Sequence, residues 1–149
     1  MPEYNFIVIG SDSKSGARRN SCEVLCSVGI SPTSRRVQIA DLVFQRQQHV
    51  TAEGVYEKLN SENRHVSRAT VYNTLKLLVD YDLLRQVTVE TSRVFYDSNI
   101  SPHHHFFDID SGELKDIEAE QFEILGMPEP PPGKSVAGVD VVVRLKSTG

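Results

Sequence analysis

The feature that most constrains the fold of this chain is a change of hydrophobic period near residue 84. Before it, "VSRATVYNTLKLLVDYDLL" repeats apolar residues at helical spacing, with Val71, Leu75 and Leu78 on one face. After it, "RQVTVE" and "RVFYDS" alternate apolar and polar residues across a short "TS" turn. A helix that leads directly into a hairpin indicates a winged helix-turn-helix. A generic helical domain with an added hairpin is the alternative.

The preceding segments carry further helix signals. Thr51 is a good N-cap for the apolar stripe in "VTAEGVYEKLNSE", and Ser67 is a good N-cap for the helix described above. "SCEVLCSVG" is typical of a short helix with Ser21 as its cap and Gly29 as its stop, and another helical segment follows Pro32. We therefore expect a winged-helix DNA-binding domain over residues 21–98, after a flexible N-terminal arm over residues 1–20, which ends in the Ser-, Gly- and Arg-containing "SDSKSGARRN".

The second half predicts a small sheet. The strand candidates are "HFFDI", "ELKDI" and "VDVVVRL", and the short helix candidate is "EAEQFEIL". The prolines of "MPEPPPG" exclude both a helix and a paired strand from that segment. Three strands and one helix are too little to be stable alone, so we interpret residues 99–149 as a dimerisation domain. The expected class is α+β: an N-terminal winged helix-turn-helix followed by a small α/β dimerisation domain, with a three-stranded antiparallel sheet plus a short helix, in a homodimer.

Charge divides the chain in the same place. Residues 1–96 hold 12 Lys/Arg against 10 Asp/Glu, whereas residues 97–149 hold 4 against 10. We expect a polyanion to bind to the first half and cations to bind to the second half. Two cysteines are too few for a disulfide framework, and no apolar run is long enough to span a membrane. We expect a cytoplasmic protein with no membrane partner.

A run of three histidines in "SPHHHFFDID" suggests a metal site. Alternate strand residues share a face, so His103 and His105 can reach one ion while His104 points away. Asp97 and Asp116 are nearby oxygen donors. Imidazoles with carboxylates suit Fe(II), Mn(II) or Zn(II). A solvated loop is the alternative.

The segments "HVTAEGVYEKL", "VSRATVYNTLKLLVDYDLLRQV" and "RVFYDSN", followed by the histidine run, resemble the ferric uptake regulator superfamily over roughly residues 21–146. The histidine run without cysteines and the ending "MPEPPPG…VDVVVRL" are most similar to its iron response regulator branch. The resemblance implies a dimeric transcriptional regulator of iron, haem or metal homeostasis and not an enzyme. It also implies that residues 99–149 sense a metal ion or haem. The implied metal site has the ligands His49, Asp97, His103, His105 and Asp116.

The resemblance further implies an AT-rich palindromic operator in double-stranded DNA. The helix from Arg68 to about Tyr81 would enter the major groove, where arginine can read guanine and a tyrosine ring can contact a thymine methyl group. Two arginines would bind phosphate, and basic residues of the arm could reach a minor groove. The expected DNA-binding residues are Ser67, Arg68, Thr70, Tyr72 and Asn73 on the helix, Arg35 and Arg36 at phosphates, and Lys14, Arg18 and Arg19 in the arm.

The chain also departs from the superfamily. No cysteine follows Cys26, so the structural zinc held by CxxC pairs in other members cannot be bound. Neither cysteine precedes a proline, so the Cys-Pro haem motif of the iron response branch is missing. If haem binds, the histidines 103–105 must ligate it.

Two other functions stay open. The aspartates Asp97 and Asp116 resemble the peroxide-sensing branch, in which the site histidines are oxidised. Two histidines and a carboxylate also describe a non-haem Fe(II) oxygenase, although no barrel of strands is expected. The residues leave open which metal binds and whether it strengthens or weakens DNA binding.

Overall fold

The structure, a computed structural model, describes residues 20–149. The predicted arm, with Lys14, Arg18 and Arg19, lies outside these residues apart from Asn20. The chain divides into two compact units, one ending at Ile100 and the other spanning Ser101–Gly149. We call them the helical unit and the sheet unit.

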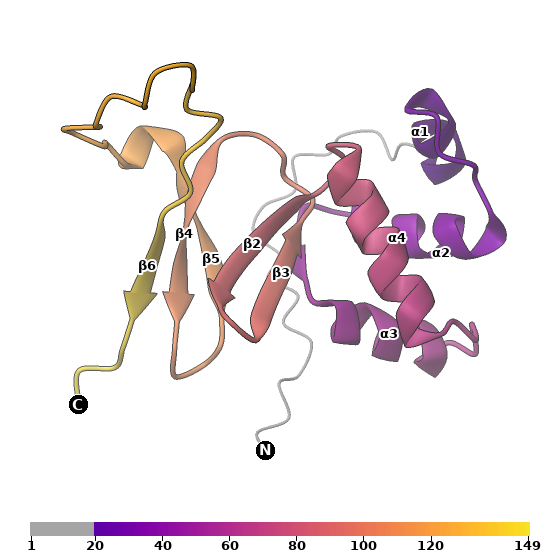
Figure 1. The fold of residues 1–149 in the computed structure, drawn as a ribbon. Helices are drawn as coiled ribbons and strands as arrows, with labels where there is room; N and C mark the ends of the chain where they lie inside the picture. The colour runs from indigo at the N-terminus through magenta and orange to yellow at the C-terminus, as the bar shows by residue number, and fades with distance from the viewer. Residues whose placement is uncertain (1–19) are drawn as a thin grey trace. The chain divides into compact units, whose positions relative to one another are not determined.

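The described part of the helical unit contains four α-helices, coloured indigo to magenta in Figure 1. They are α1 (Ser21–Ser27), α2 (Ser34–Phe44), α3 (Ala52–Ser61) and α4 (Arg68–Asp80). The predicted caps of α3 and α4 are confirmed, because Thr51 accepts from the Gly54 N–H and Ser67 from the Thr70 N–H. The predicted cap of α1 is wrong: Asn20 caps this helix, and Ser21 is already its first, buried residue.

The core of this unit comes from the apolar stripes of α2, α3 and α4. Val55, Val71, Leu75 and Leu78 are completely buried, as the helical spacing predicted. Burial of each such side chain contributes about 1.5–3 kcal/mol relative to exposure. The opposite face of α4 is thereby left to solvent.

The wing is a hairpin of β2 (Arg85–Glu90) and β3 (Arg93–Asp97), which pair antiparallel across the predicted turn. A strand absent from the sequence prediction, β1 (His49–Val50), pairs with the other edge of β3. In this register His49 is directly opposite Asp97. Two residues are too few to show a period, which explains why β1 was missed.

The sheet unit has the strand order β5-β4-β6. β4 (His103–Asp108) and β5 (Leu114–Glu118) are antiparallel and joined by a turn in which the Gly112 N–H donates to the Asp108 carbonyl at 2.8 Å. Gly112 has φ +75°, a conformation that favours glycine.

The prediction of a wholly antiparallel sheet is wrong in one pairing, since β6 (Val142–Leu145) runs parallel to β4. β5 ends beside the start of β4, where Glu118 is opposite His103. The connection over residues 122–141 returns the chain to that same end, so β6 must leave in the direction of β4. β6 is also shorter than the expected strand 139–145.

The predicted helix over residues 118–125 is only the single 3₁₀ turn η1 (Ala119–Gln121). Phe122, at its end, is extended, and the prolines of "MPEPPPG" follow soon after. Among residues 20–149, no helix is long and apolar enough to cross a membrane.

Candidate metal centre and nucleic-acid interface

The first turns of α4 present polar groups to solvent. The Oγ atom of Ser67 accepts from the Thr70 N–H at 3.1 Å and lies 2.8 Å from the Thr70 hydroxyl. Tyr72 is 50% exposed, and Asn73 is exposed beside it. A hydroxyl, a ring and an amide at the start of a helix are groups that can contact base edges and phosphates.

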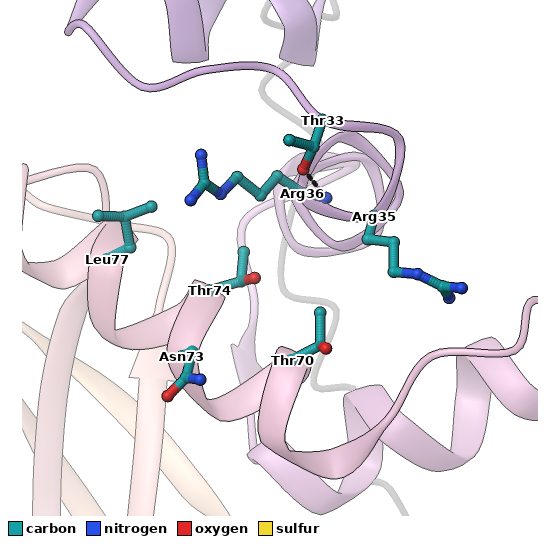
Figure 2. A pocket seen from close by; sticks show the side chains of 7 residues that line it. All are labelled: Thr33, Arg35, Arg36, Thr70, Asn73, Thr74 and Leu77. Atoms are coloured by element: carbon teal, nitrogen blue, oxygen red, sulfur yellow. Dashed lines mark hydrogen bonds between the residues drawn. The ribbon is translucent and has the colours of Figure 1, made fainter.

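A groove of about 370 Å³ lies between α2 and α4. Figure 2 shows its lining, which consists of Thr33, Arg35, Arg36, Thr70, Asn73, Thr74 and Leu77. Arg36 donates from Nη1 to the Ser31 carbonyl at 3.0 Å, and Arg35 donates to the His65 carbonyl. Each such bond uses one of the five N–H groups of a guanidinium. Both predicted phosphate-binding arginines therefore lie beside α4, held by backbone carbonyls.

Arg68 has a different environment. It donates from Nη2 to Glu53 Oε1 at 2.8 Å and from Nε to Glu53 Oε2 at 3.1 Å, and its Cζ lies 4.2 Å from the centre of the Tyr56 ring. The Arg68 hydrogen bond lowers the pKa of the Glu53 carboxyl below its ordinary value. Sequence reasoning missed this contact, because Glu53 and Arg68 lie on different helices with no local signal that joins them.

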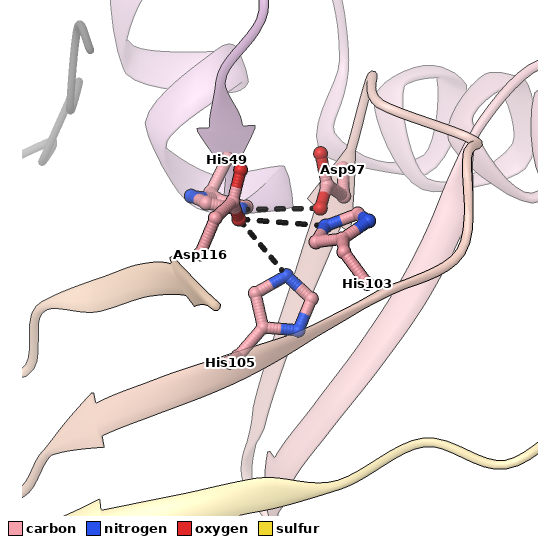
Figure 3. Close-up of side chains that lie close together, drawn as sticks. All are labelled: His49, Asp97, His103, His105 and Asp116. Atoms are coloured by element: carbon pink, nitrogen blue, oxygen red, sulfur yellow. Dashed lines mark hydrogen bonds and ion pairs between the residues drawn. The ribbon is translucent and has the colours of Figure 1, made fainter. Parts of the chain in front are cut away.

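In the helical unit, β1 and β3 bring together two predicted metal ligands. His49 Nε2 lies 3.1 Å from Asp97 Oδ2, and both side chains are buried (Figure 3). The other carboxylate oxygen, Oδ1, accepts from the Asn99 N–H at 2.9 Å. An imidazole beside an oriented carboxylate is half of a typical divalent metal site.

The neighbours of this pair are tied to the end of α2. The buried Gln48 side chain donates from Nε2 to the carbonyls of Leu42 and Val43, at 2.8 and 2.9 Å. Its backbone N–H donates to Ser98 Oγ at 2.9 Å, and the Ser98 N–H donates to the Gln48 carbonyl at 3.2 Å. Gln48 precedes His49 and Ser98 follows Asp97, so both ligands lie on backbone that is fixed at two points.

In the sheet unit, β4 and β5 bring together the other three predicted ligands. Asp116 Oδ1 lies 3.4 Å from His103 Nε2 and 3.2 Å from His105 Nε2 (Figure 3). The two rings are buried with centroids 4.6 Å apart, and the three residues offer ligand atoms within 4.8 Å of one another. The histidine run is therefore a strand and not a solvated loop.

The hydrogen bonds of His103 favour a cation at this point. Its Nδ1 lies 2.6 Å from the Ser101 carbonyl oxygen, and a carbonyl only accepts, so Nδ1 carries a proton. In the neutral ring Nε2 then presents a lone pair toward Asp116, and two acceptors that face each other need a proton or a metal ion between them. A carbonyl on the outer nitrogen is a common support of a metal-binding histidine.

His104 lies on the other face of β4, as predicted. Its Nδ1 accepts from the Val141 N–H at 3.2 Å, and its ring centroid lies 4.7 Å from that of Phe122. These contacts hold the chain just before β6 and take His104 away from the Asp116 cluster. The haem role of His103, His104 and His105 stays a prediction.

Both cysteines lie on α1, four residues apart. Desolvation, and secondarily the neighbouring Cys26, raise the pKa of the Cys22 thiol. A thiol with a raised pKa is a poorer nucleophile and metal ligand. Both cysteines belong to the helical unit, and the sequence of the sheet unit contains none.

Comparisons with known proteins agree with this arrangement. The chain is 28% identical over 97 residues to the peroxide-responsive repressor PerR of Staphylococcus aureus, a match that covers 65% of this chain and 66%, just under two thirds, of that protein. The ferric uptake regulator of Pseudomonas aeruginosa with manganese is similar in structure, with a TM-score of 0.67 and 22% identity, over 88% of this chain and all of the other. The regulator of Francisella tularensis with iron has a TM-score of 0.64 and 16% identity, over 80% and 92%.

These likenesses confirm the predicted fold class of an N-terminal helix-turn-helix with a small α/β domain. A sequence model described as the Ferric uptake regulator family matches residues 27–127, which is more than half of the chain. The chain belongs to the ferric uptake regulator family.

Proposed function

We propose that this protein is a dimeric, sequence-specific DNA-binding transcriptional regulator whose DNA affinity is gated by a divalent metal ion. The observation that carries the proposal is the convergence of His103 and His105 on the Asp116 carboxylate, two buried imidazoles on one oxygen. Two imidazoles and a carboxylate that meet at one point form a common donor set for a divalent ion. The cluster is therefore suited to holding an ion.

The proposed metal site also includes His49 and Asp97. The sheet-unit cluster supplies two nitrogens and a carboxylate, and the helical-unit pair supplies one of each. Together they match the three-His, two-Asp donor set that suits Fe(II), Mn(II) or Zn(II). The similar regulators from Pseudomonas and Francisella are described with manganese and iron, which supports this choice of metals.

The gating follows from the connection between the two ligand groups. Asp97 ends β3 and His103 begins β4, so only residues 98–102 separate them. An ion bound to both groups would restrict the orientation of the helical unit. In a dimer, that orientation fixes the distance between two recognition helices, which must match the operator half-sites. We expect a coupling of about 1–3 kcal/mol.

In this proposal α4 enters the major groove of an AT-rich palindrome. The exposed Tyr72 ring contacts a thymine methyl group, Asn73 reads a base, and Arg35 and Arg36 in the groove beside α4 bind phosphates. Ser67 and Thr70 contribute hydroxyls at the helix start, and Lys14, Arg18 and Arg19 are proposed for the minor groove. β6, with Leu145 41% exposed, is the proposed dimer face.

The test is a selection of preferred duplexes from a random library, with the full chain in its apo form, with Mn(II) and with haem. We expect an AT-rich palindrome whose affinity differs about 5- to 150-fold between the apo and Mn(II) forms. His103→Ala should make that affinity insensitive to Mn(II). If no sequence is enriched in any state, the chain is not a sequence-specific regulator.

Peroxide sensing is the second candidate. It is favoured by the 28% identity to a peroxide-responsive repressor and by the two aspartates, Asp97 and Asp116, of the proposed site. Treatment with Fe(II) and peroxide should then add one oxygen atom to the peptide that contains His103 and His105. An unmodified peptide, together with unchanged DNA affinity, would favour metal or haem sensing in the iron response manner.

A further inference from the structure

The guanidinium of Arg68 is held in place by two side chains of α3. The Glu53 carboxylate accepts hydrogen bonds from Nε and Nη2, at 3.1 and 2.8 Å, and Cζ lies over the Tyr56 ring, 4.2 Å from its centroid. This clamp is at the surface, where Arg68 is 60% and Glu53 44% exposed. A surface ion pair contributes little to stability, so the arrangement calls for another explanation.

The clamp uses only one edge of the guanidinium. Glu53 binds it from the side, through Nε and one N–H of Nη2, whereas the end-on fork consists of Nη1 and the second N–H of Nη2. Two parallel donors on that fork match the N7 and O6 acceptors of guanine. Because Tyr56 fixes the plane and Glu53 fixes the rotation about the side chain, less rotamer freedom is lost when the fork binds.

The position of Arg68 favours a base over a phosphate. Arg68 is the first residue of α4, and the N-terminal residues of a recognition helix contact base edges. The Glu53 carboxylate beside the guanidinium repels a second anion such as phosphate, but it tolerates the neutral edge of a guanine. Arg35 and Arg36 donate to backbone carbonyls and not to a carboxylate, so they lack this preference for a base over a phosphate.

We propose that Glu53 and Tyr56 are positioning residues that present Arg68 for end-on recognition of one guanine in each operator half-site. The inference rests on the proposed DNA-binding function and assigns a specificity element to it. Arg68 is then the residue that reads this guanine, and the two α3 residues act through it.

The experiment uses the full chain and the duplex selected from the random library, with and without Mn(II). Each guanine of the selected half-site is replaced by adenine in turn, with its partner base. For each protein variant, the measured quantity is the dissociation constant for the adenine-substituted duplex divided by that for the guanine-containing duplex. A ratio taken on one preparation does not change when part of that preparation is unfolded.

We expect the wild type to prefer one guanine by about tenfold or more, and Arg68→Ala to lose that preference. Glu53→Gln should lower it by about fivefold, because an uncharged amide orients the guanidinium weakly. Glu57→Gln, the same change on an exposed glutamate of α3, is the matched control and should keep the full preference. Tyr56→Phe retains the ring and should also keep it.

Equal ratios for Glu53→Gln and Glu57→Gln would overturn the positioning role. A uniform loss of affinity for all duplexes in Arg68→Ala, at an unchanged ratio, would identify a phosphate contact and also overturn it. A wild-type chain that prefers no duplex would instead refute the proposed function, and the inference with it.

Discussion

Both units bury proposed metal ligands, but they differ in how much apolar core accompanies those ligands. In the helical unit Val55, Val71 and Leu75 are completely buried, and the polar residues of α4 that could read DNA are exposed. In the sheet unit the apolar core includes Phe107 and Leu114, with the imidazoles of His103 and His105 buried as well. The sheet unit also exposes large apolar side chains, namely Ile109, Ile124, Leu125, Met127, Val136, Val139 and Leu145.

This difference separates folding from DNA recognition in the helical unit and joins folding to metal binding in the sheet unit. The helical unit is stabilised by apolar burial, so its recognition surface can change without loss of the fold. A buried imidazole must be compensated by hydrogen bonds or by a ligand, and exposed apolar surface favours association. We therefore expect the stability of the sheet unit to depend on its metal and its partner copy.

The largest effect should come from the core of the helical unit. Leu75→Ala leaves a cavity in a fully buried site and should lower the free energy of unfolding by about 2–5 kcal/mol, whether or not Mn(II) is present. Denaturant unfolding measures this loss. Lys76→Ala, at the exposed neighbouring position, is the control and should change the midpoint little. A Leu75→Ala variant as stable as this control would contradict the proposed source of stability.

A loss of similar size should affect metal binding in the sheet unit. His105→Ala removes one of the two imidazoles that face Asp116 and should weaken Mn(II) binding by at least about 100-fold. We expect Mn(II) to raise the melting temperature of the wild-type protein, and this rise should be absent in His105→Ala. Calorimetric titration and thermal unfolding measure the two effects. Unchanged Mn(II) affinity would show that these histidines are buried for another reason.

Association should depend on β6. Val143→Glu places a charge on a half-buried residue of this strand and should convert the dimer to a monomer, as measured by analytical ultracentrifugation. Thr148→Glu adds the same charge beyond the strand and should leave the dimer intact. If both variants remain dimeric, the partner binds elsewhere.

A smaller change should follow from Tyr72→Ala on α4. The ring is half exposed, so the melting temperature should not change, whereas specific DNA affinity should fall by about 1 kcal/mol, or roughly fivefold. Tyr72→Phe keeps the ring and should retain most of the affinity. A lower melting temperature with normal binding by the folded fraction would make Tyr72 a structural residue.

The smallest effect on ligand binding is expected for His104→Ala. Mn(II) affinity should not change, because the ring faces away from the Asp116 cluster. Stability should fall by about 1 kcal/mol, since the Val141 N–H loses its acceptor. Equal loss of Mn(II) in His104→Ala and His105→Ala would remove the distinction between the two faces of β4.

The sequence predicted the elements whose signals are local. The stripe of α4 and the caps Thr51 and Ser67 lie within a few residues of what they determine, and the alternation over 103–108 was enough to place His103 and His105 on one face. The pairing of His49 with Asp97 entered only through resemblance to a family. The two-residue strand that aligns them has no period of its own.

The features that were missed depend on distant parts of the chain. The direction of β6 is set by the long connection over residues 122–141 and not by its own apolar pattern. The Glu53–Arg68 pair joins two helices, and the backbone path between them determines whether the side chains meet. Residues that suit a local element can therefore be found in the sequence, whereas contacts between elements that lie far apart in the chain cannot.

The buried Gln48 restricts which substitutions the position before His49 can tolerate. Its amide donates to two carbonyls at the end of α2, and a carboxylate of the same shape has no hydrogen to donate and would repel both oxygens. The change Gln48→Glu also arises without mutation, because deamidation hydrolyses the amide to a carboxylate. In either case the segment that carries His49 would lose its two hydrogen bonds to α2. The exposed Gln47 next to it can take the same change freely. Two adjacent glutamines should thus accumulate substitutions and deamidation at very different rates.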